Sequence, residues 1–289
     1  MQPEAGILTG YRVRVKSKQV QGSSMWHLVA GILKESHQGQ RWLLVCLALM
    51  MYRPCLADLP ATIDRIKPSI VGVGTVQKTR RPPYRIVGTG FVVADGHYVI
   101  TNAHVIPKQV NTARLEYLAI FAGEDKQMDI RQAVKVEIDE RHDLALLKFE
   151  GKPLPALSLG QSSKVREGKE YAFTGYPLGI IFGLYPVTHR GIISSIVPVA
   201  LQANAANQLD PTQIRRLRDQ YKVFQLDATA YPGNSGSPLY DTETAEVIGV
   251  INKVFVKDGR ENVLAKPSGI SYAMPIEYAR KLLKRAGLN

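Results

Sequence analysis

The chain has 289 residues, of which 45% are apolar and 21% charged, and this composition excludes a disordered protein. The formal net charge is +12, and residues 1–57 contribute +5 of it through seven Lys/Arg and two Asp/Glu. Zinc-finger spacings and arginine stripes with interleaved aromatic residues do not occur, so we expect no nucleic-acid partner.

The N-terminal segment combines basic residues with a short apolar run. Residues 42–51 read WLLVCLALMM, which is too short to span a membrane comfortably, since a spanning helix needs about 20 residues. Lys34 and Arg41 precede the run, and small residues at 55 and 57 follow it, which is the pattern of a secretory signal peptide. We therefore expect 1–57 to be a signal peptide or leader and the protein to be exported, either to the periplasm or secreted. A retained anchor, with membrane contact through this segment alone, and a buried helix are the alternatives.

The rest of the chain is rich in short β segments. They recur about every ten residues between Gly and Pro turns, which favours a sandwich or barrels. Asp95-Gly96 predicts a two-residue hairpin. We expect strands at Ser69–Val76, Gly90–Ala94, Tyr98–Thr101, Arg114–Phe121, Ala133–Ile138, Leu144–Phe149, Glu170–Thr174, Gly191–Val197, Phe224–Asp227, Val247–Ile251 and Ser271–Met274.

Two segments have helical patterns. Asp210-Pro211 provides an N-cap and a first-turn proline, and apolar residues recur at helical spacing up to Tyr221, with a basic opposite face that includes Lys222. The C-terminal segment Pro275–Arg285 is a short amphipathic helix.

Acyl transfer to a serine needs an attacking hydroxyl, a base, a carboxylate that orients the base, and N–H donors for the oxyanion. Ser235 lies in the sequence Gly233-Asn234-Ser235-Gly236, whose glycines let the backbone turn sharply and aim two N–H groups at one point. We predict Ser235 as the nucleophile and the backbone of Gly233, Asn234 and Ser235 as the oxyanion hole. An ordinary polar turn is the alternative.

His104 and Asp143 supply the other two parts. His104 directly follows an apolar strand and small residues, and Asp143 begins a nearly continuous apolar run. A carboxylate at such an edge is partly buried and needs a donor, which a histidine Nδ1–H provides. His142 competes with His104, and Asp139 and Glu140 are nearby alternatives to Asp143.

These motifs resemble the chymotrypsin/trypsin-fold serine proteases, and among them the HtrA/Deg family. TNAHV, DLALLK and GNSGSPL are similar to the His, Asp and Ser blocks, and GYPLG, RGIIS, LDA, EVIG and SYAMP are similar to HtrA/Deg segments. The resemblance covers about residues 60–285 and implies an all-β fold of two six-stranded antiparallel β-barrels with a short C-terminal helix. We expect this domain at 58–289, with the barrels dividing near 155–170. His104 and Asp143 would come from the first barrel and Ser235 from the second.

Three features depart from the family pattern. Ser237 replaces the usual second glycine, and GNSGSP is similar to the glutamyl endopeptidases of the same fold. The sequence ends at Asn289, directly after the expected protease domain. We therefore expect no PDZ domain of the kind that most HtrA/Deg proteins carry, and no assembly driven by such a domain. The predicted insertion around 199–222 is longer than usual.

The resemblance implies a serine endopeptidase that acts on polypeptides, with unfolded proteins and protein quality control as one option and a homo-oligomer as another. Thr229 replaces trypsin's pocket aspartate, so we expect small or medium apolar residues before the cleaved bond. Ile251, Asn252 and Lys253 are expected to line the pocket. Lys253 would favour acidic residues if it faces the pocket, and an orientation toward solvent is the alternative. We expect no metal and no cofactor. A proteolytically silent binding or chaperone-like protein of the same fold and a glutamyl-endopeptidase-like protease are the alternatives.

Overall fold

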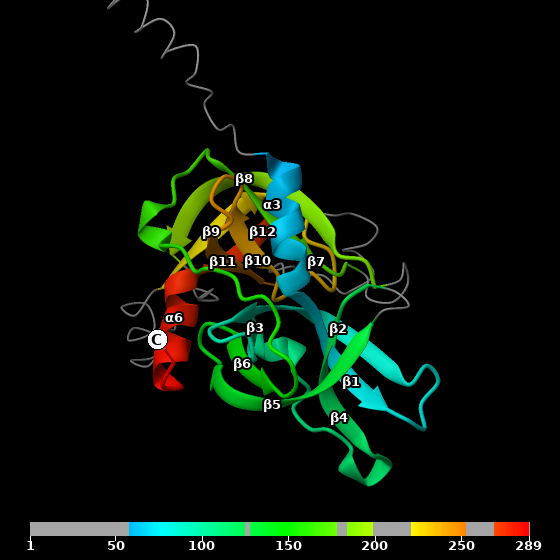
Figure 1. Ribbon diagram of the computed structural model, residues 1–289. Coiled ribbons are helices and arrows are strands. Elements are labelled where there is room, and N and C mark those ends of the chain that lie inside the picture. The colour runs from blue at the N-terminus through cyan, green and yellow to red at the C-terminus, as the bar shows by residue number, and fades with distance from the viewer. Residues whose placement is uncertain (1–57, 125–127, 178–183, 199–220, 253–268, 289) are drawn as a thin grey trace, which may run out of the picture. The chain divides into compact units, whose positions relative to one another are not determined.

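The computed structural model describes residues 58–124, 128–177, 184–198, 221–252 and 269–288. The predicted leader, Lys253 and most of the predicted helix at 210–222 lie outside these residues. Within them the fold is all-β, with two closed six-stranded antiparallel barrels and a short C-terminal helix, as the resemblance implied (Figure 1). No helix in this part of the chain is long and apolar enough to cross a membrane.

The first barrel closes in the order β1-β2-β3-β6-β5-β4. Its strands are β1 (Ile70–Gln77), β2 (Tyr84–Val93), β3 (Tyr98–Thr101), β4 (Glu116–Ala122), β5 (Asp129–Asp139) and β6 (Leu144–Phe149). The second barrel closes in the order β10-β11-β12-β9-β8-β7. Its strands are β7 (Glu170–Gly175), β8 (Val187–Pro198), β9 (Lys222–Asp227), β10 (Pro238–Asp241), β11 (Val247–Asn252) and β12 (Ile270–Pro275).

Helices and short turns complete the described fold. The α-helices are α3 (Leu59–Ile66) and α6 (Ile276–Arg285). The 3-10 turns are η1 (Lys67–Ser69), η2 (Ala103–Val105), η3 (Thr112–Arg114) and η5 (Ser162–Lys164). Residues 150–169 connect β6 of the first barrel to β7 of the second.

Strand β6 is buried on both faces over its first four residues, 144–147, which explains its apolar run, whereas Lys148 is exposed. Ala145 and Leu147 lie in the interior cluster of the first barrel, whereas Leu144 and Leu146 belong to a cluster that both barrels share. Successive side chains of a strand point to opposite faces, so a strand between two cores needs apolar residues at every position. Asp143 directly precedes β6 and is adjacent to Leu144, so it lies at the edge of the cluster that both barrels share.

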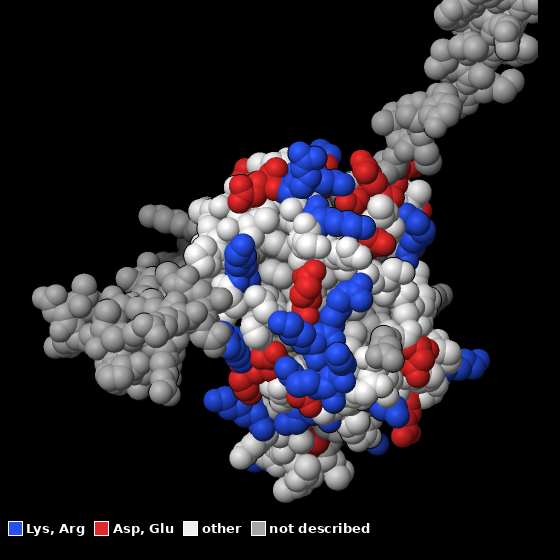
Figure 2. All heavy atoms as spheres, turned by 90° about the vertical axis from the view of Figure 1, so that its left-hand side faces the viewer, with Lys and Arg blue, Asp and Glu red and all other residues white. Residues whose placement is uncertain are grey.

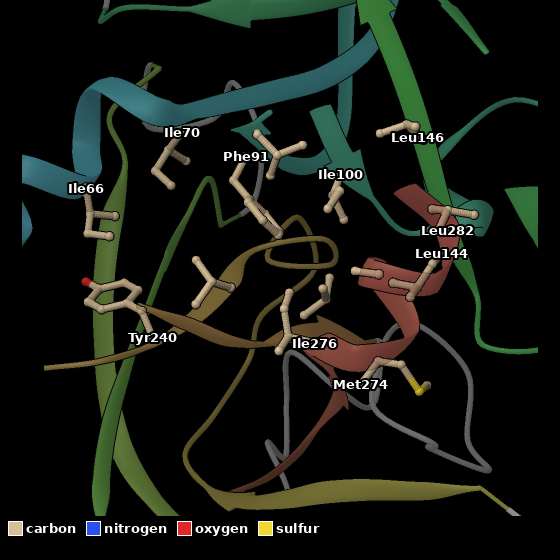
Figure 3. Packing of buried hydrophobic residues seen from close by; sticks show 14 of the residues in the cluster. Ile66, Ile70, Phe91, Ile100, Leu144, Leu146, Tyr240, Met274, Ile276 and Leu282 are labelled. Carbon is tan, nitrogen blue, oxygen red and sulfur yellow. The ribbon is translucent and has the colours of Figure 1, made fainter. Parts of the chain in front are cut away.

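The shared cluster joins the barrels and α6 into one core. Figure 3 shows Phe91, Ile100 and Leu144 of the first barrel facing Met274 of the second and Leu282 of α6. Four of these side chains are fully buried and Met274 is nearly so. The two halves of the site are therefore held together by apolar burial.

Several elements differ from the sequence predictions. β10 and α3 were not predicted, because β10 is short and starts at a proline, and α3 is a short helix after the leader. The hairpin at Asp95-Gly96 has four connecting residues, 94–97, between the paired Val93 and Tyr98. Lys222 begins strand β9 and does not continue a helix.

Candidate active site

The first part of the site is a histidine held by a carboxylate. The Nδ1 atom of His104 lies 2.5 Å from Oδ2 of Asp143, and the backbone N–H of His104 donates to Oδ1 of Asp143 at 2.9 Å. His104 belongs to η2, which follows strand β3. Because an ionised carboxylate only accepts hydrogen bonds, this pairing places the imidazole proton on Nδ1 and leaves Nε2 as an acceptor.

The backbone of Asp143 adopts an unusual conformation. Its φ is 51°, in the left-handed region that non-glycine residues rarely occupy. Its carbonyl oxygen accepts hydrogen bonds from Asn102 Nδ2 at 2.9 Å and from the Ala103 N–H at 3.1 Å. The segment around His104 thus holds both the side chain and the backbone of Asp143.

The second part is the loop between β9 and β10 that carries Ser235, the predicted nucleophile, and this loop is called the nucleophile loop. Gly233 has φ 101° and Gly236 has φ 90°, which are conformations that glycine adopts readily. A β-carbon at Gly236 would lie 2.0 Å from the carbonyl oxygen of Thr89, so no other residue fits there without backbone movement. The N–H of Asn234 donates to the Tyr231 carbonyl at 3.0 Å and is therefore not available to an oxyanion.

Thr89, in strand β2, connects the two parts across the seam. Its N–H donates to the Ser235 carbonyl at 2.9 Å, and its hydroxyl donates to the Gly233 carbonyl at 2.7 Å. The same hydroxyl accepts the N–H of Tyr176 at 2.9 Å, and the Thr89 carbonyl accepts the Thr101 hydroxyl at 2.7 Å. Thr89 was not predicted from the sequence, where its position between Gly88 and Gly90 is the signal that points to it.

The side chains of His104 and Ser235 are not hydrogen-bonded to each other among the described contacts. Gly88 of β2 contacts both sides of the site, because a β-carbon there would lie 2.6 Å from Cγ2 of Val105, the residue after His104, and 2.9 Å from the Ser235 carbonyl oxygen. Catalytic hydrogen bonds often tighten only when substrate binds.

Behind the nucleophile loop lies a buried polar pair without hydrogen-bond partners among the described residues. The side chains of Asn234 and Ser237 are fully buried, and neither amide atom of Asn234 nor Oγ of Ser237 has a partner there. A β-carbon at Gly175 would lie 2.0 Å from Ser237 Oγ and 3.0 Å from Asn234 Oδ1. The serine at position 237 therefore depends on the glycine at position 175.

The predicted pocket residues lie in different surroundings. Thr229 is partly exposed, Ile251 is fully buried in the core of the second barrel, and Asn252 is buried at 8% exposure. Lys253 is outside the described residues. Ser271, which was not predicted from the sequence, holds the backbone on both sides of Thr229. Its hydroxyl donates to the Ala228 carbonyl at 2.6 Å and accepts the Ala230 N–H at 2.8 Å.

The alternatives to His104 and Asp143 form a separate pair. His142 Nδ1 donates to Asp139 Oδ2 at 2.9 Å, and the side chains are 13% and 10% exposed. The His104 side chain is 36% exposed, so it is the more accessible of these two histidines. Among the described residues, no group of three or more His, Cys, Asp or Glu is arranged to hold a metal ion.

Two closed six-stranded β-barrels, with a His–Asp pair in one and a Gly-Asn-Ser-Gly loop in the other, are the architecture of the trypsin-like peptidases. The family described as "Trypsin-like peptidase domain" matches residues 88–250, and the chain belongs to this family.

Named relatives narrow the similarity further. The chain is 26% identical to a "Probable periplasmic serine endoprotease DegP-like" of Halomonas elongata, with 82% of this chain and 52% of the relative covered. A protein of the same description from Pseudomonas putida is 32% identical, covering 67% of this chain and 33% of the relative. "Serine protease HTRA4" of Homo sapiens is 29% identical over 78% of this chain and 40% of the relative. The chain thus spans about half, or less, of the length of these relatives.

Solved structures agree with the fold. The HtrA-type protease AlgW with tripeptide has a TM-score of 0.55 and 26% identity, covering 78% of this chain and 62% of that one. The serine endoprotease from Yersinia pestis has a TM-score of 0.55 at 23% identity, covering 79% and 66%, and this likeness concerns the fold alone.

Proposed function

We propose that the chain is a serine endopeptidase in which Ser235 is the nucleophile, His104 the general base and Asp143 the carboxylate that orients it. The observation that carries this proposal is the double attachment of His104 to Asp143, through Nδ1 at 2.5 Å and the backbone N–H at 2.9 Å. It fixes the imidazole in the tautomer whose Nε2 can accept a proton.

In the proposed reaction, Nε2 of His104 takes the hydroxyl proton as Ser235 Oγ attacks the peptide carbonyl carbon. The carbonyl oxygen becomes an oxyanion, which the N–H groups of Gly233 and Ser235 stabilise. The imidazolium then gives its proton to the leaving amine, and the C–N bond breaks to leave an acyl-enzyme. Water then attacks this ester as His104 takes one of its protons, the ester C–O bond breaks, and the imidazolium returns the proton to Ser235 Oγ while the carboxylic acid product leaves. Of the three predicted oxyanion donors, Asn234 is left out because its N–H is already bonded to Tyr231.

A serine-directed fluorophosphonate probe tests this assignment on the full chain. We expect the wild type to be labelled and Ser235→Ala to be unlabelled with its fold retained. Asp143→Asn should lower turnover about 10⁴-fold, because it favours the wrong tautomer of His104. Asp95→Asn is the matched control. Oδ1 of Asp95 also lies near a histidine, 3.4 Å from Nδ1 of His97, but this pair is away from the seam.

Two results would contradict the proposal. Labelling of Ser235→Ala equal to the wild type would show that another residue reacts. A wild type that binds polypeptides but is never labelled would favour the proteolytically silent alternative.

For specificity we propose cleavage after small or medium apolar residues, because Thr229 offers no charge to a basic side chain. The buried side chain of Ile251 supports a structural role for that residue and leaves Thr229 and Asn252 as the pocket candidates. The second option is a preference for acidic residues through Lys253. A peptide library separates the two, because cleavage after Glu that is lost in Lys253→Met would favour the glutamyl-endopeptidase-like function.

We further propose that the protein is exported and acts on polypeptides outside the cytoplasm, with 1–57 as its leader and 58–289 as its catalytic domain. The description of its bacterial relatives as periplasmic supports this proposal. N-terminal sequencing of the protein recovered from fractionated cells tests it, and a start near Asp58 is expected. Analytical ultracentrifugation of the same material gives its molecular mass in solution and so tests whether the protein forms a homo-oligomer.

A further inference from the structure

A second histidine–carboxylate pair lies directly beside Asp143. His142 and Asp139 are joined twice, since Nδ1 of His142 donates to Oδ2 at 2.9 Å and the backbone N–H of His142 donates to Oδ1 at 3.2 Å. Both side chains are nearly buried. This pair closes the turn between β5 and β6, and the next residue along the chain is Asp143.

Aromatic rings from the other side of the seam enclose the His142 imidazole. The ring of Tyr278 in α6 stacks on it with centroids 3.9 Å apart and an interplanar angle of 16°. The ring of Tyr221, which directly precedes β9 of the second barrel, meets its edge at 4.9 Å and 70°. A turn of the first barrel is thus held by side chains of the second barrel and the C-terminal helix.

Charged groups of α6 and of the turn complete these contacts. Nε of Arg285 lies 3.0 Å from Oε1 of Glu137, and Nη2 of Arg285 lies 3.4 Å from Oδ2 of Asp139. The guanidinium of Arg141 lies 5.9 Å from the centre of the Tyr221 ring. Figure 2 views the side on which α6 lies in Figure 1 and shows Lys and Arg grouped there with fewer acidic residues.

Asp143 needs support of this kind because of its backbone. A non-glycine residue with φ 51° is strained, and such a conformation persists only where the surrounding structure holds it. On one side Asn102 and Ala103 bind its carbonyl oxygen. On the other side the chain continues directly into His142.

We propose that His142 is a positioning residue: clamped between Tyr278 of α6 and Asp139 of β5, it fixes Asp143, and through it His104, relative to the second barrel that carries Ser235. The inference rests on the proposed peptidase function and deepens it by extending the site to α6. A displacement of about 1 Å in a catalytic group can lower the rate about 100-fold, so loss of the contacts of His142 is expected to lower kcat measurably.

Two replacements of His142 separate the contributions of its ring and its hydrogen bond. His142→Phe keeps a ring against Tyr278 but cannot donate to Asp139, whereas His142→Asn keeps a donor near the Nδ1 position without the ring. Tyr278→Leu removes the stacking partner from the helix. The matched control is His97→Phe, because His97 also lies beside a carboxylate, Asp95, and an aromatic ring, but at the opposite ends of β3 and β6.

The kinetic readout uses a fluorogenic peptide with a small apolar residue before the cleaved bond. We expect kcat to fall about 10- to 100-fold in His142→Phe and Tyr278→Leu with KM within twofold of the wild type, and less in His142→Asn. His97→Phe should match the wild type. A loss that acts only through stability would not lower kcat in samples shown by circular dichroism to be folded.

The second readout does not need activity. The proton in the short hydrogen bond between His104 and Asp143 gives a far-downfield proton resonance in NMR spectra of the full chain, assigned by its loss in Asp143→Asn. We expect this resonance to shift or disappear in His142→Phe and Tyr278→Leu and to stay in place in His97→Phe. An inactive wild type would end the proposed function, and the NMR comparison would still decide the clamp. An unchanged resonance in His142→Phe, or an unchanged kcat, would overturn the inference.

Discussion

Thr89 is the residue on which the two barrels depend most directly at the active site. It is fully buried, and its hydroxyl bridges the Gly233 carbonyl and the Tyr176 N–H, both in the second barrel. A buried polar group that loses its partner keeps its desolvation penalty, which is about 1–3 kcal/mol. Replacing this hydroxyl would therefore leave two backbone groups, the Gly233 carbonyl and the Tyr176 N–H, unpaired near Ser235.

We predict that Thr89→Val lowers the free energy of unfolding by about 1–3 kcal/mol and also lowers kcat, because the Gly233 peptide is no longer fixed. Urea denaturation measures the first effect and peptide hydrolysis the second. Thr89→Ser keeps the hydroxyl and should recover most of both losses. A Thr89→Val protein with wild-type stability and kcat would show that the bridge has no effect.

At the scale of the element, β7 and the nucleophile loop fit together through one close approach. Gly175 ends β7, and a β-carbon there would lie 2.0 Å from Ser237 Oγ and 2.8 Å from Thr89 Oγ1. Interiors are closely packed, so an added methyl group forces neighbouring atoms to move.

We predict that Gly175→Ala destabilises the protein by about 1–3 kcal/mol, as overpacking typically does. Ser237→Gly removes the nearest atom, so in the double variant part of this loss should be recovered. Thermal or urea denaturation of the two single variants and the double variant measures the coupling. Strictly additive losses would mean that the two positions do not interact.

At the scale of the whole molecule, several buried or bonded groups make stability depend on pH. The N–H of Asn111 is the largest cause of the lowered pKa of Glu116. Burial alone would raise the pKa of Asp241, but hydrogen bonds from Lys169 and from backbone N–H groups outweigh burial, so its pKa is lowered. The pKa of Asp139 is lowered in the same way, because hydrogen bonds from the side chain and backbone of His142 outweigh burial. These carboxylates stabilise the fold above their ordinary values of 4.5 and 3.8, and the effect is lost as pH falls through their folded values.

His189 acts at a higher pH. Burial lowers its pKa from 6.5, and its ring stacks on Phe173 at 4.9 Å. The unfolded chain therefore binds the proton more readily, so stability begins to fall as pH drops below about 6.5.

The alkaline limit has a different origin. Burial raises the pKa of Tyr176 and of Tyr240 above the ordinary value of 10.0, and a hydrogen bond to Asp241 raises the pKa of Lys169 above 10.5. Groups with raised folded pKa values stabilise the fold below their unfolded values, and the effect is lost at higher pH.

We therefore predict a stability plateau between about pH 6.5 and pH 10, with losses on both sides. Urea denaturation of the full chain at a series of pH values measures it. In His189→Phe the decline between about pH 6.5 and pH 5 should disappear, while the steeper loss below pH 4.5 remains. If the variant follows the wild type across this range, His189 is not the titrating group.

The sequence by itself determined most of the fold and predicted the chemistry of the candidate site. Alternating and continuous apolar runs predicted, approximately, eleven of the twelve strands that the described residues form, because burial on one or both faces of a strand leaves a direct pattern in the sequence. The glycines around Ser235 and the apolar strands beside His104 and Asp143 indicated the site, because sharp turns and buried edges restrict residue choice.

The tertiary structure alone decided which groups meet across the seam. Local patterns favoured His104 and Asp143 but could not show that His142 and Asp139 form a pair of their own, which is less exposed than the pair His104–Asp143. Nor could they show Thr89 bonded to Gly233 or Tyr278 stacked on His142, because these partners are more than 130 residues apart in sequence. Contacts of this range depend on how two barrels pack, which no short segment of sequence specifies.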